Sequence, residues 1–278
     1  MIYEKINLKD HFEFLGADGK NPTLELFLPY NLKEMGRENE KRPCMIVCPG
    51  GGYACCSERE AEPIALNFLN QGFNAFILTY SVAPHRFPTQ LCEVAAVMEL
   101  IYKNADNWNC DTSKIAIIGF SAGGHLVAHY STMFDCKEVR EIFPESKSVN
   151  ASVLCYPVIS ADEKVGHTGT FENLLGHKPQ NKAEEEYFSC DCQVTANTPP
   201  AFIWHTVKDE LVPVQNSILY ANALADNNVP FELHIYPEGP HGLATCDSST
   251  YHEVPDCAKY AADWLLSLKK WLKLVFEL

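Results

Sequence analysis

Short apolar runs alternate along the chain with longer segments in which apolar residues recur every three or four positions. Seven runs are predicted to be strands, at residues 23–28, 44–48, 74–80, 114–120, 151–156, 201–206 and 231–236. Several of them, such as 115–118, are apolar on both faces. This is typical of a mostly parallel sheet that is covered by helices.

The segments between the strands show helical periodicity. The two clearest have apolar positions at Leu91, Val94, Ala95, Met98 and Ile101, and at Tyr260, Trp264, Leu265, Leu268, Trp271 and Leu272. Residues 60–70 and 214–226 are further predicted helices. The alternation of strands and helices predicts an α/β fold with helices on both faces of the sheet. We expect a single domain over residues 1–278.

Two segments interrupt this alternation. Residues 31–42 are polar and are predicted to form a surface loop. Residues 162–200 are long, polar and weakly periodic, which inside a compact domain usually indicates a functional excursion. We expect a small lid here, and its candidate wall residues are Phe171, Leu174, Leu175, Tyr187 and Phe188. Packing of these side chains in the core is the alternative.

The most informative motif is Gly119-x-Ser121-x-Gly123, which directly follows an apolar strand and precedes a helical segment. That context is typical of a nucleophile elbow, in which a sharp turn presents a serine at a helix N-terminus. The glycines leave room for a tight turn, and the helix N-terminus favours developing negative charge. Ser121 is therefore the candidate nucleophile.

A second glycine motif, Pro49-Gly-Gly-Gly-Tyr53, follows the strand at 44–48. Its backbone N–H groups can approach a ligand closely, so Gly51 and Gly52, with the N–H of Ala122, are predicted to form an oxyanion hole. A phosphate-binding loop is excluded because neither Gly-Lys-Ser/Thr nor GxGxxG spacing is present. Tyr53 is a candidate contact for the substrate alcohol, with simple packing as the alternative.

A serine nucleophile needs a base and an acid that orients the base. His241 lies in a loop after the last predicted strand, where a side chain reaches the carboxyl edge of the sheet. Asp209 follows the strand at 201–206 in the same arrangement, with Glu210 as the neighbouring alternative. The order Ser121, Asp209, His241 matches that of acyl hydrolases with this elbow. His125, His129 and His205 are predicted to be core or helix-face histidines.

Together these motifs resemble the α/β-hydrolase superfamily, and more narrowly its small esterases related to acetyl xylan esterases and hormone-sensitive lipase. The run 78–84, the triplet 86–88 and the motifs around Asp209 and His241 support the same resemblance. Pro49 stands where the family usually has histidine before the glycines. No long helical cap precedes Thr23, which favours short-acyl or sugar esters and predicts no large cap domain.

The resemblance implies a serine esterase that removes acetyl groups from carbohydrate or cleaves another small ester, without metal or cofactor. Ser121 would attack the carbonyl, His241 would take its proton and Asp209 would hold the imidazole. A serine exopeptidase and a non-catalytic binding protein on the same fold are the alternatives. Glu58-Arg59-Glu60 is interpreted as an ordinary solvated helix start.

Charge and cysteine content exclude some classes of binding partner and indicate the cellular compartment of the protein. The chain carries 22 Lys plus Arg and 36 Asp plus Glu, a net charge of −14. Nucleic acids and anionic membranes are excluded as main partners because both need basic patches. Twelve cysteines without a CxxC pair, and a start without an export signal, favour reduced thiols and a cytoplasmic protein. The partner that the resemblance implies is a small ester, such as an acetylated sugar or oligosaccharide. The oligomeric state, a homodimer included, is left open.

Overall fold

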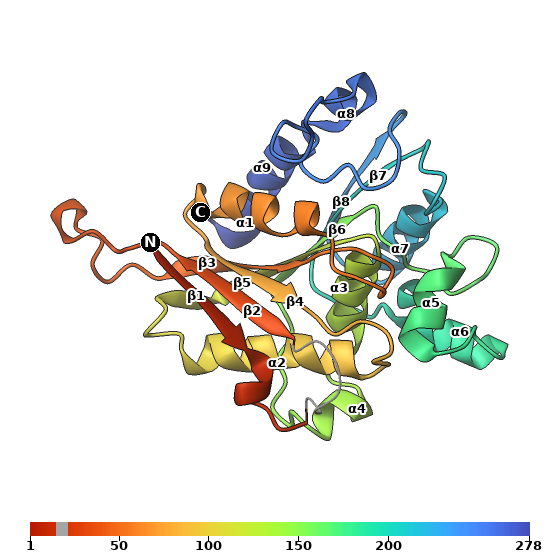
Figure 1. Cartoon of the computed structure of the whole chain (residues 1–278), viewed down its shortest axis with the longest axis horizontal. Coiled ribbons are helices and arrows are strands. Elements are labelled where there is room, and N and C mark those ends of the chain that lie inside the picture. The colour runs from red at the N-terminus through yellow and green to blue at the C-terminus, as the bar shows by residue number, and fades with distance from the viewer. Residues whose placement is uncertain (15–21) are drawn as a thin grey trace.

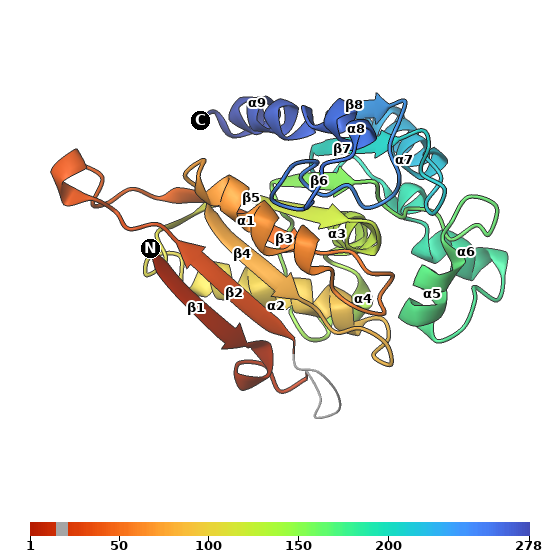
Figure 2. The same ribbon diagram turned by 45° about the horizontal axis from the view of Figure 1, so that its top comes forward.

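A computed structural model describes residues 1–14 and 22–278, and in these residues eight strands form one sheet (Figure 1). The strands are β1 (Ile2–Asn7), β2 (Thr23–Leu28), β3 (Arg42–Cys48), β4 (Asn74–Thr79), β5 (Cys110–Phe120), β6 (Ala151–Cys155), β7 (Ala201–Thr206) and β8 (Phe231–Tyr236). Their order across the sheet is β1-β2-β4-β3-β5-β6-β7-β8, which can be followed in Figure 2.

The sheet is parallel from β4 to β8, and β1 and β2 add an antiparallel edge. The carboxyl ends of β3, β5, β6, β7 and β8 therefore meet at one edge of the sheet, where the loops after them come together. Ligand sites of open α/β sheets lie at this edge. This arrangement is the mostly parallel sheet that the apolar runs predict.

Helices cover both faces of this sheet. They are α1 (Glu62–Leu69), α2 (Thr89–Lys103), α3 (Ala122–Met133), α4 (Lys137–Arg140), α5 (Thr168–Leu175), α6 (Lys182–Phe188), α7 (Gln215–Asp226), α8 (Asp256–Ala261) and α9 (Trp264–Phe276). Short 3-10 turns lie at η1 (Leu8–Asp10), η2 (Lys33–Met35), η3 (Glu58–Glu60) and η4 (Cys190–Gln193).

Two hydrophobic cores lie on opposite sides of the sheet. Residues of α2, α3 and α7 build one core, and residues of α1, α8 and α9 build the other. Successive residues of β3 point into different cores. Ile46 packs in the first core and Val47 in the second, and both are fully buried. Burial on both faces explains why this strand reads as a continuous apolar run rather than an alternating one.

All seven predicted strands are present with bounds shifted by a few residues at most, whereas β1 was not predicted. The first four residues of β1 are exposed, so the strand lacks the apolar face that marks a strand in sequence. It is held by pairing with β2, and Lys5 forms an ion pair with Glu25 across that pairing. The predicted surface loop at 31–42 contains η2, whose residues are exposed.

The segment 162–200 folds into α5, α6 and η4, packed beside α3 and α7. Phe171, Leu174 and Phe188 are buried in the first core, so core packing, the alternative to lid-wall residues, is correct for these three. Leu175 and Tyr187 are half-buried against the same core. Among the described residues, no helix combines the length and hydropathy needed to cross a bilayer.

Candidate active site

The Gly119-x-Ser121-x-Gly123 motif forms a sharp turn between β5 and α3. Ser121 has φ 54° and ψ −119°, a conformation that L-residues adopt only under constraint. A Cβ on Gly119 would lie 2.1 Å from the carbonyl oxygen of Gly123, and one on Gly123 would lie 2.2 Å from that of Cys48. Only glycine fits at either position, so the turn requires the motif.

The structure brings the three predicted triad residues together. His241 Nε2 lies 2.8 Å from Ser121 Oγ, and His241 Nδ1 lies 2.6 Å from Asp209 Oδ2. Ser121 comes from the turn after β5, Asp209 from the loop after β7 and His241 from the loop after β8. The three side chains form one hydrogen-bonded chain, whereas Glu210, the alternative acid, is exposed and lines a neighbouring pocket.

Four groups hold the Asp209 carboxylate. Oδ1 accepts hydrogen bonds from the backbone N–H groups of Leu211 and Val212, at 3.0 and 2.8 Å. Oδ2 lies within hydrogen-bond distance of both His241 and His205. Burial raises the pKa of Asp209, but the hydrogen bonds from His205 and His241 outweigh it and leave the pKa well below its usual value. Asp209 is therefore ionised at neutral pH, as an orienting acid must be.

His205 contacts the triad although the sequence did not assign it to the site. It is fully buried in β7, as a core histidine is expected to be, but its Nε2 lies 3.2 Å from Asp209 Oδ2 and 2.9 Å from the carbonyl oxygen of Val212. Both of these atoms are acceptors, so Nε2 carries the hydrogen. Nδ1 lies 2.7 Å from the Ser217 hydroxyl, so both ring nitrogens of His205 have hydrogen-bond partners.

In the glycine loop after β3, the carbonyl groups accept hydrogen bonds from within the loop, whereas the N–H groups of Gly51 and Gly52 point to the opposite side. The carbonyl of Gly50 accepts from Ser57 N–H at 3.0 Å, and that of Gly51 accepts from the N–H groups of Ala54 and Cys55. In a trans peptide the N–H points opposite to the C=O. The N–H groups of Gly51 and Gly52 therefore point to the other side, and neither has an acceptor among the described residues.

The N–H of Ala122, at the first position of α3, likewise has no acceptor in the part of the chain that the structure describes. All three N–H groups predicted for the oxyanion hole therefore lack an acceptor among the described residues. The glycine loop and the start of α3 are in close contact, since a Cβ on Gly50 would lie 3.0 Å from Ser121 Cβ. The loop and the serine are thus next to each other.

The expectation that Tyr53 contacts the substrate is wrong. Its side chain is fully buried, and its hydroxyl lies 3.0 Å from His125 Nδ1 on α3. Its ring also packs edge-on against Tyr80. Tyr53 follows two glycines with positive φ and itself has φ 56°, which turns the side chain into the core. Tyr53 therefore packs in the core, which was the alternative to a substrate contact.

The interpretation of residues 58–60 as an ordinary solvated helix start is wrong for Glu60. Glu60 is 3% exposed and accepts hydrogen bonds from Gly50 N–H at 2.9 Å and from the Tyr156 hydroxyl at 2.7 Å. Together with the Tyr80 hydroxyl, which donates to the carbonyl of Pro49 at 2.6 Å, it anchors the glycine loop. These contacts hold the loop where the family's usual histidine is replaced by Pro49.

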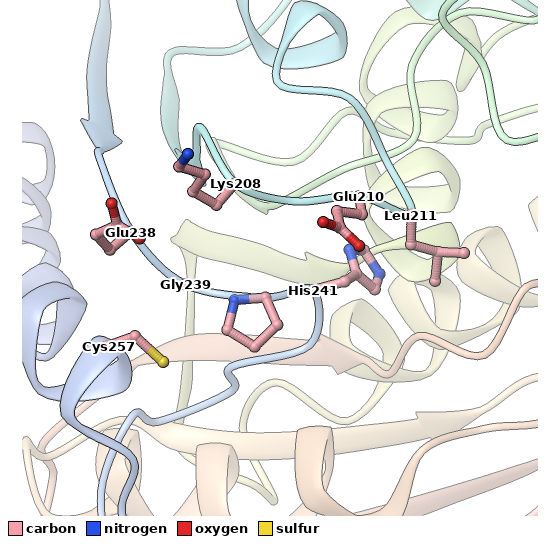
Figure 3. Close-up of a pocket in the computed structure, with 8 residues that line it drawn as sticks. Lys208, Glu210, Leu211, Glu238, Gly239, His241 and Cys257 are labelled. Carbon is pink, nitrogen blue, oxygen red and sulfur yellow. The ribbon is translucent and has the colours of Figure 1, made fainter.

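A pocket of about 650 Å³ opens beside His241, between the loops after β7 and β8 (Figure 3). It is lined by Lys208, Glu210, Leu211, Glu238, Gly239, Pro240, His241 and Cys257. Figure 3 shows Glu210 and Leu211 on one loop facing His241 and Gly239 on the other. Its lining combines three charged side chains, Lys208, Glu210 and Glu238, with the apolar side chains of Leu211 and Pro240.

Comparison with known proteins identifies the family. Residues 27–224 match the model of the BD-FAE family, which is well over half of the chain. The chain belongs to the BD-FAE family. Among solved structures, an acetyl ester-xyloside bifunctional hydrolase from Caldicellulosiruptor lactoaceticus superposes with a TM-score of 0.84 at 33% identity, covering 98% of this chain and 96% of that one. The predicted α/β-hydrolase fold is confirmed.

Curated relatives of this BD-FAE member carry hydrolase names. An endo-1,4-beta-xylanase B from Butyrivibrio fibrisolvens is 38% identical over 81% of this chain, and an acetylxylan esterase from Xylanibacter ruminicola is 33% identical over 93%. The chain spans only 36% and 49% of the length of these two proteins. A carboxylesterase from Lactobacillus plantarum has a TM-score of 0.82 at 27% identity and covers 99% and 98% of the two chains. These likenesses support the predicted class, a carboxylic ester hydrolase.

Proposed function

We propose that this protein hydrolyses short-chain carboxylic esters, with acetyl esters of carbohydrates as its main substrates. The hydrogen-bonded chain from Ser121 through His241 to Asp209 is the observation that carries the proposal. Hydrogen bonds of 2.8 and 2.6 Å join Ser121 to His241 and His241 to Asp209, which supports the proposal because acyl transfer needs a base in contact with the nucleophile.

In the proposed reaction, Ser121 Oγ attacks the ester carbonyl while His241 Nε2 takes its proton. The N–H groups of Gly51, Gly52 and Ala122 stabilise the oxyanion of the tetrahedral intermediate. His241 then donates the proton to the leaving alcohol, and the acyl group remains on Ser121. Water, deprotonated by His241, attacks the acyl-enzyme and releases the carboxylic acid and free serine.

Two observations favour acetylated carbohydrate as the substrate. The pocket beside His241 carries three charged side chains, Lys208, Glu210 and Glu238, which can form hydrogen bonds with the hydroxyl groups of a sugar leaving group. The names of relatives and structural neighbours, among them acetylxylan esterase and acetyl ester-xyloside hydrolase, point to the same class of substrate. The cytoplasmic location and the homodimer stay predictions.

The substrate class is tested with acetylated xylooligosaccharides beside nitrophenyl acetate, nitrophenyl octanoate and an aminoacyl-nitroanilide. We expect acetate release from the oligosaccharides, faster turnover of acetate than of octanoate, and no release of nitroaniline. Turnover of the nitroanilide alone would indicate the exopeptidase instead. Octanoate as the preferred substrate would contradict the short-acyl proposal while leaving ester hydrolysis in place.

A further inference from the structure

A buried carboxylate lies between the two loops that the proposed reaction uses. Glu60, at the end of η3, has its Oε2 bonded to the N–H of Gly50 and its Oε1 bonded to the hydroxyl of Tyr156. Burying a carboxylate is costly unless hydrogen bonds replace those of water. Both donors here belong to segments at the carboxyl edge of the sheet, so the carboxylate joins segments that are otherwise separate in the chain.

The first contact reaches the glycine loop. A Cβ on Gly50 would lie 2.7 Å from Glu60 Oε2 and 3.0 Å from Ser121 Cβ, so Gly50 is enclosed between the carboxylate and the serine. The Gly50 N–H is the amide directly before those of Gly51 and Gly52. Holding it in place fixes the direction in which the next two peptides leave β3.

The second contact reaches the loop that carries His241. The Tyr156 hydroxyl, which donates to Glu60, accepts a hydrogen bond from Ala244 N–H at 3.0 Å. The ring of Tyr156 packs edge-on against the His241 imidazole, with centroids 5.0 Å apart. Tyr156 also follows Cys155, whose carbonyl accepts the N–H of Ser121 at 3.0 Å.

The neighbour of Glu60 contacts the same loop. A Cβ on Gly242 would lie 2.4 Å from Arg59 Nη2, so the guanidinium packs directly on the residue after His241. The two consecutive residues of η3 therefore contact the His241 loop on one side and the glycine loop on the other. A displacement of η3 would change the relative position of the oxyanion N–H groups and the base.

We propose that Glu60 is a positioning residue for ester hydrolysis, which holds the glycine loop and the His241 loop in their relative positions through Gly50 and Tyr156. This inference rests on the proposed function, because it assumes that both loops act on the ester. In the part of the chain that the structure describes, the side-chain hydrogen bonds of Glu60 go to Gly50 and Tyr156 and not to Ser121, His241 or Asp209. The effect of Glu60 is on the geometry of the groups that act on the ester, and it should appear in the chemical step.

The test compares Glu60→Gln with the matched control Glu93→Gln. Glu93 on α2 is also fully buried and also accepts one backbone N–H and one hydroxyl, both from Ser81. In glutamine one of the two carboxylate oxygens is replaced by an NH2 group, which is a donor, so one of the two donors faces another donor instead of an acceptor. The concentration of reactive serine in each variant is first determined by fluorophosphonate labelling of a separate sample. The kcat for nitrophenyl acetate is then expressed per labelled site, and KM is measured in the same assay. Inhibition by an alkyl trifluoromethyl ketone, which forms a tetrahedral adduct with the serine, is measured in parallel.

We expect Glu60→Gln to lower kcat per labelled site by about tenfold, the effect of one misplaced hydrogen bond, with little change in KM. The trifluoromethyl ketone should bind more weakly by a similar factor, because its adduct needs the oxyanion N–H groups. Glu93→Gln should keep the wild-type kcat per labelled site even where it lowers stability. An unchanged kcat per site in Glu60→Gln, with or without fewer labelled molecules, would overturn the inference.

If Glu60→Gln does not fold, Tyr156→Phe provides a second test of the inference. This variant removes the hydroxyl that joins Glu60 to Ala244 and leaves the Glu60–Gly50 hydrogen bond in place. We expect a lower kcat per labelled site, and wild-type kcat would overturn the inference. Absence of fluorophosphonate labelling in the wild-type protein is a separate outcome, which would contradict the proposed function itself.

Discussion

His205 and His241 approach the same carboxylate oxygen, since Oδ2 of Asp209 lies 3.2 Å from Nε2 of His205 and 2.6 Å from Nδ1 of His241. The first histidine is fixed in the protein interior and the second reaches Ser121. Asp209 thus accepts a hydrogen bond from the buried His205 while it orients His241, the proposed base.

Replacing His205 tests whether this donor matters. His205→Phe keeps a buried ring but removes the N–H, and we expect kcat/KM for nitrophenyl acetate to fall by about tenfold, the effect of one hydrogen bond to a charged group. His205→Gln, whose amide N–H can replace that of the imidazole, should recover most of the loss. Equal activity of the two variants would show that Asp209 does not depend on the hydrogen bond from His205.

The elbow glycines make a prediction about stability. An alanine at Gly123 would place its Cβ 2.2 Å from the carbonyl oxygen of Cys48 and 2.3 Å from that of Pro49. Both neighbours are backbone atoms, so the elbow must shift, and we expect the free energy of unfolding to fall by at least about 3 kcal/mol. Urea unfolding followed by tryptophan fluorescence measures the change.

Gly36→Ala is the control for this prediction. Gly36 has φ +67°, and a Cβ there would meet nothing within 4 Å, so only the backbone conformation opposes the substitution. Its cost should be about 1–2 kcal/mol. A Gly36 variant that loses as much stability as the Gly123 variant would show that close packing of the elbow is not the cause.

Stability should fall on the acid side because of two buried histidines on α3. Burial lowers the pKa of His125 to about 4, and burial together with the neighbouring His125 lowers that of His129 well below its usual value. Histidines of the unfolded chain bind protons below about pH 6.5, whereas these two stay neutral in the folded protein. The stabilisation is complete above that pH and is lost as the pH falls towards 4.

Urea unfolding between pH 7 and 4.5 tests this dependence. In His125→Gln the free energy of unfolding should fall less steeply with decreasing pH, by up to about 1.4 kcal/mol per pH unit for one histidine. The amide of glutamine does not titrate. The comparison is between slopes, so a difference in stability between the two proteins at pH 7 does not affect it. Identical slopes in the two proteins would contradict neutral burial of His125.

Much of this site could be predicted from sequence because its parts follow apolar strands. Ser121, Asp209 and His241 each come after a strand that is recognisable as a buried apolar run, and parallel strands bring their carboxyl ends together. The same reasoning places the glycines after β3. Strand periodicity therefore predicted the sheet, and the motifs that follow the strands predicted the side chains that meet at its edge.

Contacts made by irregular segments could not be predicted in this way. Glu60 lies among charged residues, Glu58, Arg59 and Glu62, and only the path of η3 turns it inward. Tyr53 is buried by the left-handed backbone at and before it, which no periodicity encodes. His205 was correctly predicted to be buried, but its contact with Asp209, four residues later, depends on how the loop after β7 folds back.

The central claim is that Ser121 is the nucleophile of an ester hydrolase, and its most direct test is labelling by a fluorophosphonate followed by peptide mass spectrometry. We predict one adduct per chain, located on Ser121, that forms at the same rate as esterase activity disappears. Ser121→Ala should fold with an unchanged circular dichroism spectrum, take up no label and release no acetate. An adduct on another residue, or esterase activity that persists in Ser121→Ala, would contradict the account.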